Sequence, residues 1–337
     1  MSELLLFDTG STDPAWNLAF EQYVFDTLEP GSRACILWQN RSSVIIGRYQ
    51  NTYAEIDTDF VQTHDIPVVR RRSGGGAVYH DLGNLNYTLI GDAADGADDL
   101  HRFCQPLCRT LRALGLDAEV SGRNDLTVGG LKCSGSAQYQ RHGRVMNHGA
   151  ILFATDLNML SRVLRVDETK LQAKGIPSVR SRVTNIRPLL SGPYTDLCLS
   201  DFRARLLEAL REGQTLLPVA LSPAELDAVE VLRRARYGSW DWNFGQSKRC
   251  DLTRKRRIEG CGTMETQISL DAGRILSLEF RGDFFSRGDP AVLAAYLLNA
   301  RMTREDLTDR LAGIAAADYI AGLSNEQLID LLLDREN

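Results

Sequence analysis

Residues 70–81 read Arg70-Arg71-Arg72-Ser73-Gly74-Gly75-Gly76-Ala77-Val78-Tyr79-His80-Asp81. An apolar run, Ile66 to Val69, leads into the arginines, and a second apolar run follows the glycines. Because glycine lacks a side chain, a ligand can lie against the backbone N–H groups, and neighbouring guanidinium groups offer charge and paired donors to the same anion. The pattern predicts a loop between two strands that binds phosphate or carboxylate oxygens; the alternative is a tight loop with a solvated basic rim. It matches neither the Rossmann G-x-G-x-x-G pattern nor the Walker motif, so a nucleotide bound here would use neither arrangement.

A lysine and a histidine lie on two later strand-like segments. Lys132 stands in Leu131-Lys132-Cys133-Ser134-Gly135-Ser136-Ala137, shortly after Ser121-Gly122-Arg123-Asn124-Asp125-Leu126. Strand alternation puts Lys132 and Ser134 on one face and Cys133 on the other, so the cysteine is expected in the core. The lysine either extends into solvent or points at an anion. His148, next to Gly149 at the start of an apolar strand, is either a structural residue or part of a pocket wall.

The composition is that of an ordinary globular protein. The 337 residues include 39 basic and 44 acidic side chains, a net charge of −5, with 43% hydrophobic residues. This balance does not indicate a nucleic-acid or membrane-surface binder. No apolar run approaches the ~18 residues of a membrane helix, and the first residues read as a strand rather than a signal peptide. The seven cysteines are scattered without a C-x-x-C pair, which indicates reduced thiols in the cytoplasm and no zinc site.

Apolar periodicity predicts an α+β chain of two domains. We expect a large mixed-sheet domain at residues 1–246, a basic linker at 247–257 and a small α+β domain at 258–337. Helical periodicity is clearest at 13–28 and about 98–114. Further expected helices lie at about 156–165, 167–174, 196–212, 223–236, 290–299, 304–313 and 325–334. Expected strands lie at 34–38, 43–47, 66–70, 85–90, 118–121, 125–129, 131–139 and 144–154, with a hairpin at 263–270 and 275–281.

Taken together and in order, these segments resemble lipoate–protein ligases of the A type, within the biotin/lipoate protein ligase superfamily. The stretches that carry the resemblance are residues 70–84, 121–126 and 132–137. It extends to Ala173-Lys174-Gly175-Ile176-Pro177-Ser178-Val179-Arg180-Ser181-Arg182-Val183-Thr184-Asn185, to Asn17-Leu18-Ala19-Phe20-Glu21 and to Trp240-Asp241-Trp242-Asn243-Phe244-Gly245. The loop between Asp125 and Lys132 is shorter than in some relatives. The resemblance implies a large catalytic domain of the biotin/lipoate ligase type followed by a small accessory domain.

The resemblance also implies a two-step reaction. Lipoate and ATP, with Mg²⁺ carried by the ATP, give lipoyl-adenylate and diphosphate, and a lysine of a lipoyl domain then takes the lipoyl group and releases AMP. The implied acceptors are the lipoyl domains of 2-oxoacid dehydrogenase acyltransferase subunits and the glycine cleavage H protein. The protein is expected to be monomeric and cytoplasmic, without a tightly bound organic cofactor or resident metal.

The same resemblance assigns residues to the two substrates. Lys132 is the expected catalytic residue, placed between the acyl carbonyl and the phosphate. The ATP site is expected to comprise Arg71, Gly76, Ala77, Val78, Tyr79, Asp125 and Lys132, with Asn124 as an alternative to Asp125. The lipoate site is expected to comprise Lys132, Ser73, His80, Asn84, Ser134, Gly135 and His148, with Leu18 and Ala150 as further wall residues. Lys174 is expected to close over the adenylate.

Three other functions stay open at this point. An octanoyl or lipoyl transferase of the same superfamily would move the acyl group through a cysteine thioester without ATP, with Cys133 as the candidate nucleophile. A biotin ligase shares the expected fold and chemistry, but its glycine- and arginine-rich loop has a different order. A binding module would hold lipoate or a nucleotide without turnover.

Overall fold

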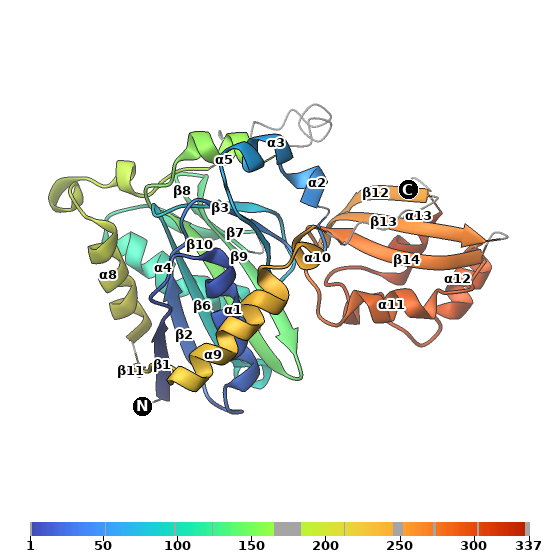
Figure 1. Ribbon diagram of the computed structural model, residues 1–337, viewed down its shortest axis with the longest axis horizontal. Coiled ribbons are helices and arrows are strands. Elements are labelled where there is room, and N and C mark those ends of the chain that lie inside the picture. The colour runs from blue at the N-terminus through green and yellow to red at the C-terminus, as the bar shows by residue number, and fades with distance from the viewer. Residues whose placement is uncertain are drawn as a thin grey trace.

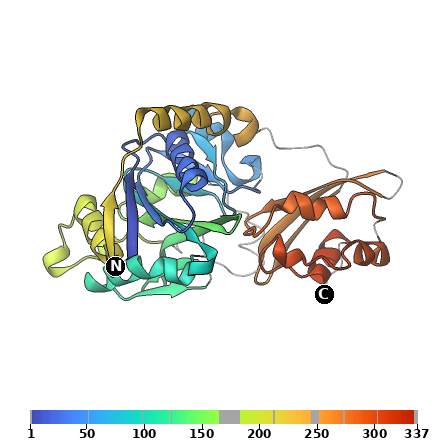
Figure 2. The same ribbon diagram turned by 90° about the horizontal axis from the view of Figure 1, so that it is seen from below.

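The computed structural model describes the chain except residues 1, 51, 98, 123, 165–182, 212, 245–251, 272–273, 302 and 334–337. It has two bodies side by side along the long axis, a larger one from the N-terminal part and a smaller one from the C-terminal part (Figure 1). Turning the molecule by 90° shows the same division (Figure 2). Each body has its own sheet and hydrophobic core, so the expected α+β fold is confirmed.

An eight-stranded mixed sheet forms the centre of the larger body. The strand order is β11-β1-β2-β6-β10-β9-β8-β7, in which β1 pairs in parallel with β11 and β2 and the other pairs are antiparallel. The strands are β1 (Ser2–Asp8), β2 (Ala34–Trp38), β6 (Asn84–Asp92), β7 (Ala118–Ser121), β8 (Asp125–Val128), β9 (Leu131–Arg141), β10 (Arg144–Leu152) and β11 (Gln214–Pro218). The strand β11 was not predicted from the sequence.

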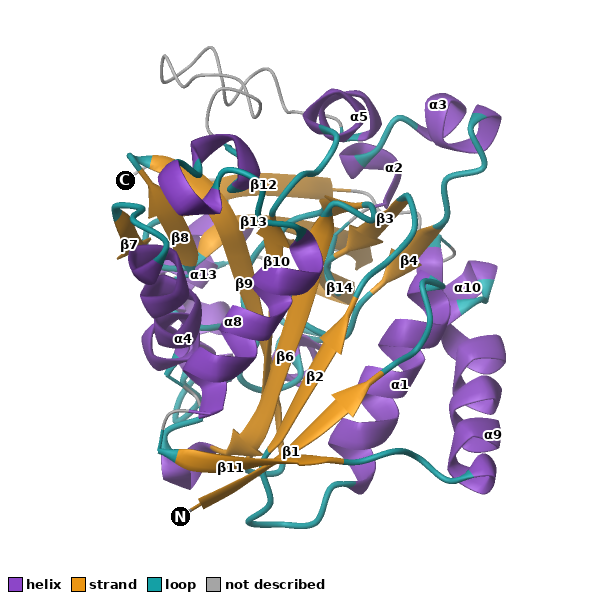
Figure 3. Cartoon of the chain, turned by 90° about the vertical axis from the view of Figure 1, so that its left-hand side faces the viewer, coloured by secondary structure: helices purple, strands orange, loops and turns teal. Residues whose placement is uncertain are grey.

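Helices cover both faces of this sheet (Figure 3). On one face, α1 (Pro14–Thr27) packs against α9 (Pro223–Leu232); Asp13 caps α1, and Pro14 occupies its first turn. On the other face, α4 (Leu100–Ala113), which contains Pro106, packs against α8 (Leu199–Arg211). Buried side chains of the sheet therefore divide into a core under α4 and α8 and a second core under α1 and α9.

A second, three-stranded sheet holds the glycine loop. Its order is β4-β3-β5, with β3 (Ser43–Ile46) parallel to β4 (Val68–Arg70) and antiparallel to β5 (Val78–His80). The loop therefore joins the two outer strands. The shorter helices of the larger body are α2 (Thr52–Glu55), α3 (Thr58–Thr63), α5 (Leu157–Val163) and α10 (Trp240–Asn243), and a π-helical turn spans Arg233–Tyr237.

The smaller body is an antiparallel sheet covered by helices. Its strands are β12 (Leu252–Ile258), β13 (Gly262–Asp271) and β14 (Arg274–Gly282), and its helices are α11 (Pro290–Tyr296), α12 (Arg304–Arg310) and α13 (Asn325–Leu332). The prediction of a linker at 247–257 is wrong for residues 252–257, which belong to β12. The basic residues there alternate between exposed and half-buried positions on an edge strand, where charge is tolerated because one side faces solvent.

The two bodies touch at the glycine loop and at the turn after β3. The Gly75 N–H donates to the Phe284 carbonyl at 3.2 Å, and the Gly282 N–H donates to the Tyr49 carbonyl at 2.7 Å. The rings of Tyr49 and Phe284 stack with centroids 4.7 Å apart. Among the described residues, no helix is long and apolar enough to cross a membrane.

Candidate active site

Each of the three glycines in the loop is explained by a different structural feature. A side chain on Gly74 would lie 2.1 Å from the Phe284 carbonyl oxygen, so this glycine permits the close approach of the smaller body. Gly75 has φ +91°, in the region that favours glycine. Around Gly76, nothing lies within 4 Å of the place a side chain would take, so its backbone is open to a ligand.

Arg70 and Arg72 hold the protein together rather than binding an anion. The Arg70 side chain is 1% exposed and donates to the carbonyls of Gly47 and Gln50, at 2.8 and 2.7 Å, and to the Trp242 carbonyl at 3.0 Å. Arg72 pairs with Asp26 at 2.9 Å and donates to the Tyr139 hydroxyl. The prediction that three adjacent arginines serve one anion is therefore wrong for Arg70 and Arg72, because the backbone turns them toward protein acceptors.

Arg71 is the arginine that reaches the cavity described below. It braces the glycine loop by donating to the carbonyls of Gly74 and Gly76, at 2.7 and 2.8 Å, and to the Ser73 hydroxyl at 3.0 Å. Burial lowers the pKa of Arg71 to about 10, and Glu21 partly offsets this. The guanidinium therefore still carries its charge at neutral pH, at the edge of a loop with exposed backbone groups.

A narrow cavity lies between the large sheet and the three-stranded sheet. Predicted site residues in its wall are Arg71, Gly76, Ala77, Val78, His80, Lys132, Gly135 and His148, together with Leu18, Asn124 and Ala150. Predicted site residues outside this wall are Ser73, Tyr79, Asn84, Asp125 and Ser134. The structure thus brings together residues from the three sequence motifs, which are separated by dozens of positions in the chain. Lys174 lies outside the described residues.

Lys132 reaches the open end of this cavity. Its amine lies 2.7 Å from the Asp125 carboxylate, and it curls over Gly135, where a side chain would stand 2.8 Å from the amine. Both charged side chains are partly exposed, at 38% and 36%. The absent side chain of Gly135 therefore leaves the space that the lysine occupies.

A β-bulge changes which residues accompany Lys132. The register between β8 and β9 shifts at Leu126/Thr127, so that Thr127 pairs with Lys132 but Leu126 pairs with Ser134. Ser134 therefore lies on the same face of the sheet as its partner Leu126, which belongs to the core under α4. Gly135 lies on the opposite face, which lines the cavity. The prediction that Lys132 and Ser134 share a face is wrong, because alternation fails across a bulge.

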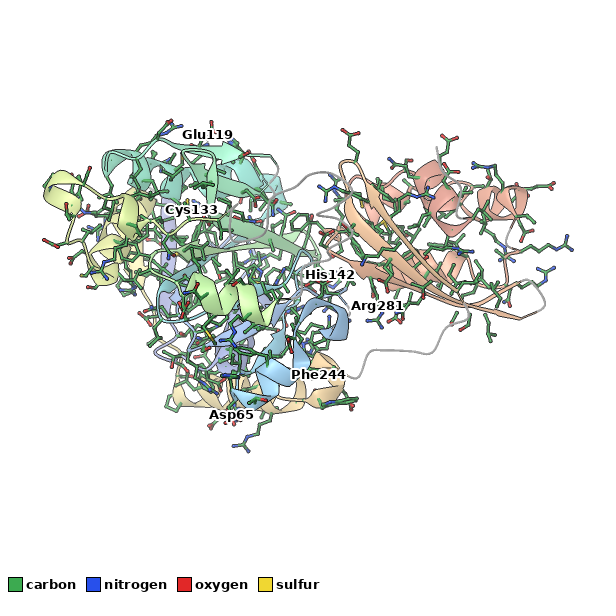
Figure 4. All side chains as sticks on the ribbon, turned by 90° about the horizontal axis from the view of Figure 1, so that it is seen from above. Asp65, Glu119, Cys133, His142, Phe244 and Arg281 are labelled. Carbon is green, nitrogen blue, oxygen red and sulfur yellow. The ribbon has the colours of Figure 1, made fainter. Side chains whose placement is uncertain are left out.

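Cys133 is a core residue, as predicted. It is 0% exposed, its thiol donates to the Leu126 carbonyl at 3.4 Å, and it lies inside the larger body (Figure 4). Burial raises the pKa of the thiol to about 12. A thiol that neither ionises near neutral pH nor reaches the cavity is not a nucleophile.

A buried chain of hydrogen bonds joins helix α1 to the glycine loop. The Ser73 hydroxyl lies 2.6 Å from His148 Nε2, and His148 Nδ1 lies 2.8 Å from the Glu21 carboxylate, which also accepts from the Thr88 hydroxyl. Although a serine, a histidine and a carboxylate are aligned, Ser73 is 0% exposed and is not part of the cavity wall. These hydrogen bonds therefore position the loop and His148, and the Ser73 hydroxyl is not a nucleophile.

Three features of the site were not predicted from the sequence: Trp38, Asn86 and the role of Glu21. Trp38 and Asn86 line the cavity, and Glu21, which is 2% exposed, contacts the wall residue His148. A signal for Asn86 was present, because Asn84, Asn86 and Thr88 alternate with apolar residues on a strand that is buried on both faces. Polar residues at every second position of such a strand indicate a pocket face.

A larger cavity continues from the Lys132 end, between the two bodies. It measures about 840 Å³ against about 140 Å³ for the narrow cavity, and both share Gly75, Gly76, Asn124 and Lys132. Its wall also includes Asp125 from the larger body and Arg257, at the end of β12, from the smaller body. Within the described part of the chain, no group of three or more His, Cys, Asp or Glu side chains is arranged to hold a metal ion.

These features define a class of protein. A narrow cavity with a largely apolar wall ends at a lysine amine, and beyond that amine lies a roomier cavity beside an arginine and open loop backbone. This arrangement suits a protein that buries the tail of a carboxylic acid and presents its carboxylate to a second, anionic substrate.

Comparisons with known proteins agree. Residues 13–211 match the family model of the lipoyl protein ligase A/B catalytic domain, and residues 247–332 match that of the bacterial lipoate protein ligase C-terminus. The lipoate-protein ligase LplJ of Bacillus subtilis is 35% identical over 98% of this chain and 99% of its own.

Two solved structures are also similar to this chain. The bipartite lipoate protein ligase of Thermoplasma acidophilum, described with its E2 lipoyl domain, matches with a TM-score of 0.64 and 29% identity over 74% of this chain and 99% of that chain. A lipoate-protein ligase A bound with ATP matches with a TM-score of 0.60 and 29% identity, over 73% of this chain and 99% of that one. The chain belongs to the lipoate–protein ligase family, and the family resemblance found in the sequence is confirmed.

Proposed function

We propose that this protein is an ATP-dependent lipoate–protein ligase that forms lipoyl-adenylate and transfers the lipoyl group to a lysine of a lipoyl domain. The observation that carries the proposal is the position of the Lys132 amine, where the narrow cavity and the larger cavity meet. The relatives are ligases by name, and one similar structure has ATP bound.

The narrow cavity holds the lipoate tail with the carboxylate at Lys132. The tail lies among Leu18, Trp38, Ile45 and Ala150, where apolar burial contributes about 25 cal/mol per Å². ATP lies across the open backbone at Gly76 and the Arg71 guanidinium, and its phosphates extend into the larger cavity. Mg²⁺ enters as the partner of ATP.

In the first step, a carboxylate oxygen of lipoate attacks the α-phosphorus, and the bond to the diphosphate oxygen breaks. Both reactants are anionic, so fixed positive charge is needed between them. One charge pair at ~4 Å contributes about 4 kcal/mol in a partly screened site, against about 1 kcal/mol in bulk water. Lys132 supplies this charge, and Asp125 holds the amine over Gly135 until the substrates take its place.

In the second step, the amine of the acceptor lysine attacks the acyl carbon, AMP leaves and the amine loses a proton. Suitable acceptors are lipoyl domains of 2-oxoacid dehydrogenase acyltransferase subunits and the glycine cleavage H protein. The monomeric state and the cytoplasmic location belong to the same proposal. The proposed reaction does not pass through a thioester on Cys133, because this cysteine is buried away from the cavity.

Purified protein tests the proposal directly. With lipoate, Mg-ATP and an acceptor lipoyl domain, we expect diphosphate release and a lipoylated acceptor by mass spectrometry. Diphosphate release without acceptor modification would contradict the transfer step, and neither product would contradict the ligase. Biotin in place of lipoate serves as the control substrate and should give no product.

A further inference from the structure

Two side chains in the wall of the narrow cavity have buried polar atoms without a hydrogen-bond partner among the described residues. Both amide atoms of Asn86 and the Nε2 atom of His80 are buried without a hydrogen bond, in side chains of residues that are 1% and 3% exposed. An unpaired buried polar group costs roughly 1–3 kcal/mol. Groups of this kind that face a cavity indicate that something in the cavity bonds to them.

The hydrogen bonds around His80 fix which nitrogen carries the proton. The Asn17 amide nitrogen donates to the carbonyl oxygens of Gln39 and Ser11, at 2.8 and 3.1 Å, and to the Asn40 side-chain oxygen at 2.9 Å. The Asn40 nitrogen therefore faces His80 Nδ1, at 3.0 Å, and donates to it. Burial lowers the pKa of His80 to about 3, so the ring is neutral. Because Nδ1 accepts, Nε2 carries the hydrogen and is a donor without an acceptor.

Strand register places these groups at the far end from Lys132. Gly135, Ala150, Asn86 and Trp38 are successive partners across β9, β10, β6 and β2. The Lys132 amine lies over Gly135, and Asn86 is two strand spacings away, roughly 10 Å. With its carboxylate one hydrogen bond away from the Lys132 amine, an extended lipoate brings its ring to about that distance. The His80 ring is 5.9 Å from the Trp38 ring, at the same end.

We infer that His80 Nε2–H and the Asn86 amide hydrogen-bond to the sulfur atoms of the lipoate ring and so select lipoate over a plain fatty acid of the same length. The inference rests on the proposed function, which puts the carboxylate at Lys132. Sulfur is a weak acceptor in the disulfide form and a weak donor in the dithiol form, so an amide with both a free N–H and a free C=O serves either form.

A plain acyl tail loses this pairing. Octanoate brings only methylene and methyl groups to the same place, and the donors of His80 and Asn86 then stay desolvated and unpaired. A site built with buried polar groups rejects an analogue that lacks their partner more strongly than an apolar pocket can.

Asn86→Leu tests this with little change of shape. We expect the ratio of kcat/KM for lipoate to that for octanoate, measured by diphosphate release, to fall about tenfold, with octanoate unharmed or improved. Tyr87→Phe is the matched control. The Tyr87 hydroxyl is equally buried and unpaired on the same strand but is outside the cavity wall, so its removal should leave the ratio unchanged.

His80 gives an independent pair of variants. His80→Leu should lower the same ratio, and His80→Gln, which restores a donor near Nε2, should recover part of it. Equal losses of kcat/KM for lipoate and octanoate in Asn86→Leu and His80→Leu would overturn the inference. They would show that the two side chains shape the cavity or bind a water molecule. If wild-type protein gives no lipoate-dependent diphosphate, the proposed function fails first; an unchanged ratio in active variants defeats the inference alone.

Discussion

Cys133 is the residue on which a ligase and a transferase differ. It is fully buried, and the raised pKa of its thiol keeps it protonated. Cys133→Ser should therefore keep ATP-dependent lipoylation within a few-fold of wild type, with some loss of stability from a polar group in the core, about 1–3 kcal/mol. The measurement is lipoylation of an acceptor domain together with thermal unfolding. Loss of activity in a folded variant, with an acyl-enzyme trapped on the wild-type protein, would point instead to the transferase.

His80 makes stability depend on acid. Its folded-state pKa of about 3 lies below the value of about 6.5 for an unfolded histidine, so the folded state resists a proton that the unfolded state accepts. The contribution of neutral His80 to the free energy of unfolding is fully present above about pH 6.5. It is lost as the pH falls toward 3, by up to about 1.4 kcal/mol per pH unit.

His80→Leu removes that dependence. The difference in unfolding free energy between wild type and variant, measured by urea denaturation, should narrow as the pH falls from about 6.5 to about 4. At neutral pH the variant starts less stable, because Asn40 loses its acceptor. A gap that stays constant with pH would show that His80 takes up a proton in the folded protein as readily as in the unfolded chain.

The chemical role of single residues was easier to predict than the set of residues that surrounds them in the cavity. Lys132, Arg71 and the open glycine at 76 stood out by residue type, and the structure gathers them at one cavity. Asn86 and Trp38 were not predicted. The polar alternation around Asn86 indicates a pocket face, but which residues share a cavity depends on which strands pair and in what register. Arg70 was misjudged because a buried arginine with backbone acceptors has the same sequence pattern as one that awaits a ligand.

Among the elements, β9 and the glycine loop show where local patterns stop being informative. The strand was predicted, but the bulge opposite Leu126/Thr127 was not, and it exchanges Ser134 for Gly135 on the cavity side. A bulge adds one residue to a strand without a distinctive residue type, so alternation alone cannot reveal it.

The glycine loop gives a testable prediction at this scale. Gly74→Ala would put a carbon 2.1 Å from the Phe284 carbonyl oxygen, and backbone atoms cannot yield that far. We expect the smaller body to lose its docking, including the Tyr49–Phe284 ring contact, a cost of about 1–2 kcal/mol. Small-angle scattering should show a larger radius of gyration. Gly76→Ala, which meets nothing within 4 Å, should keep the wild-type value. An unchanged radius for Gly74→Ala would contradict this packing.

In the whole molecule, two bodies enclose the larger cavity beside Lys132. Composition and periodicity predicted two α+β parts, and the sheets and cores confirm both. The basic run at the start of the smaller body looked like a linker because charge dominates it, whereas residues 252–258 form its edge strand. How the bodies meet at Phe284 and the glycine loop is a long-range contact, which no local pattern specifies.

The central claim is that the Lys132 amine lets a carboxylate react with the α-phosphate of ATP. The most direct measurement compares diphosphate release from lipoate and Mg-ATP by wild type, Lys132→Met and Lys255→Met. Lys255 lies exposed on β12 and outside both cavities, so its replacement controls for the loss of a lysine charge. We predict at least about a hundredfold loss for Lys132→Met in folded protein, and wild-type rates for Lys255→Met. A Lys132→Met protein that forms lipoyl-adenylate at the wild-type rate would contradict the account.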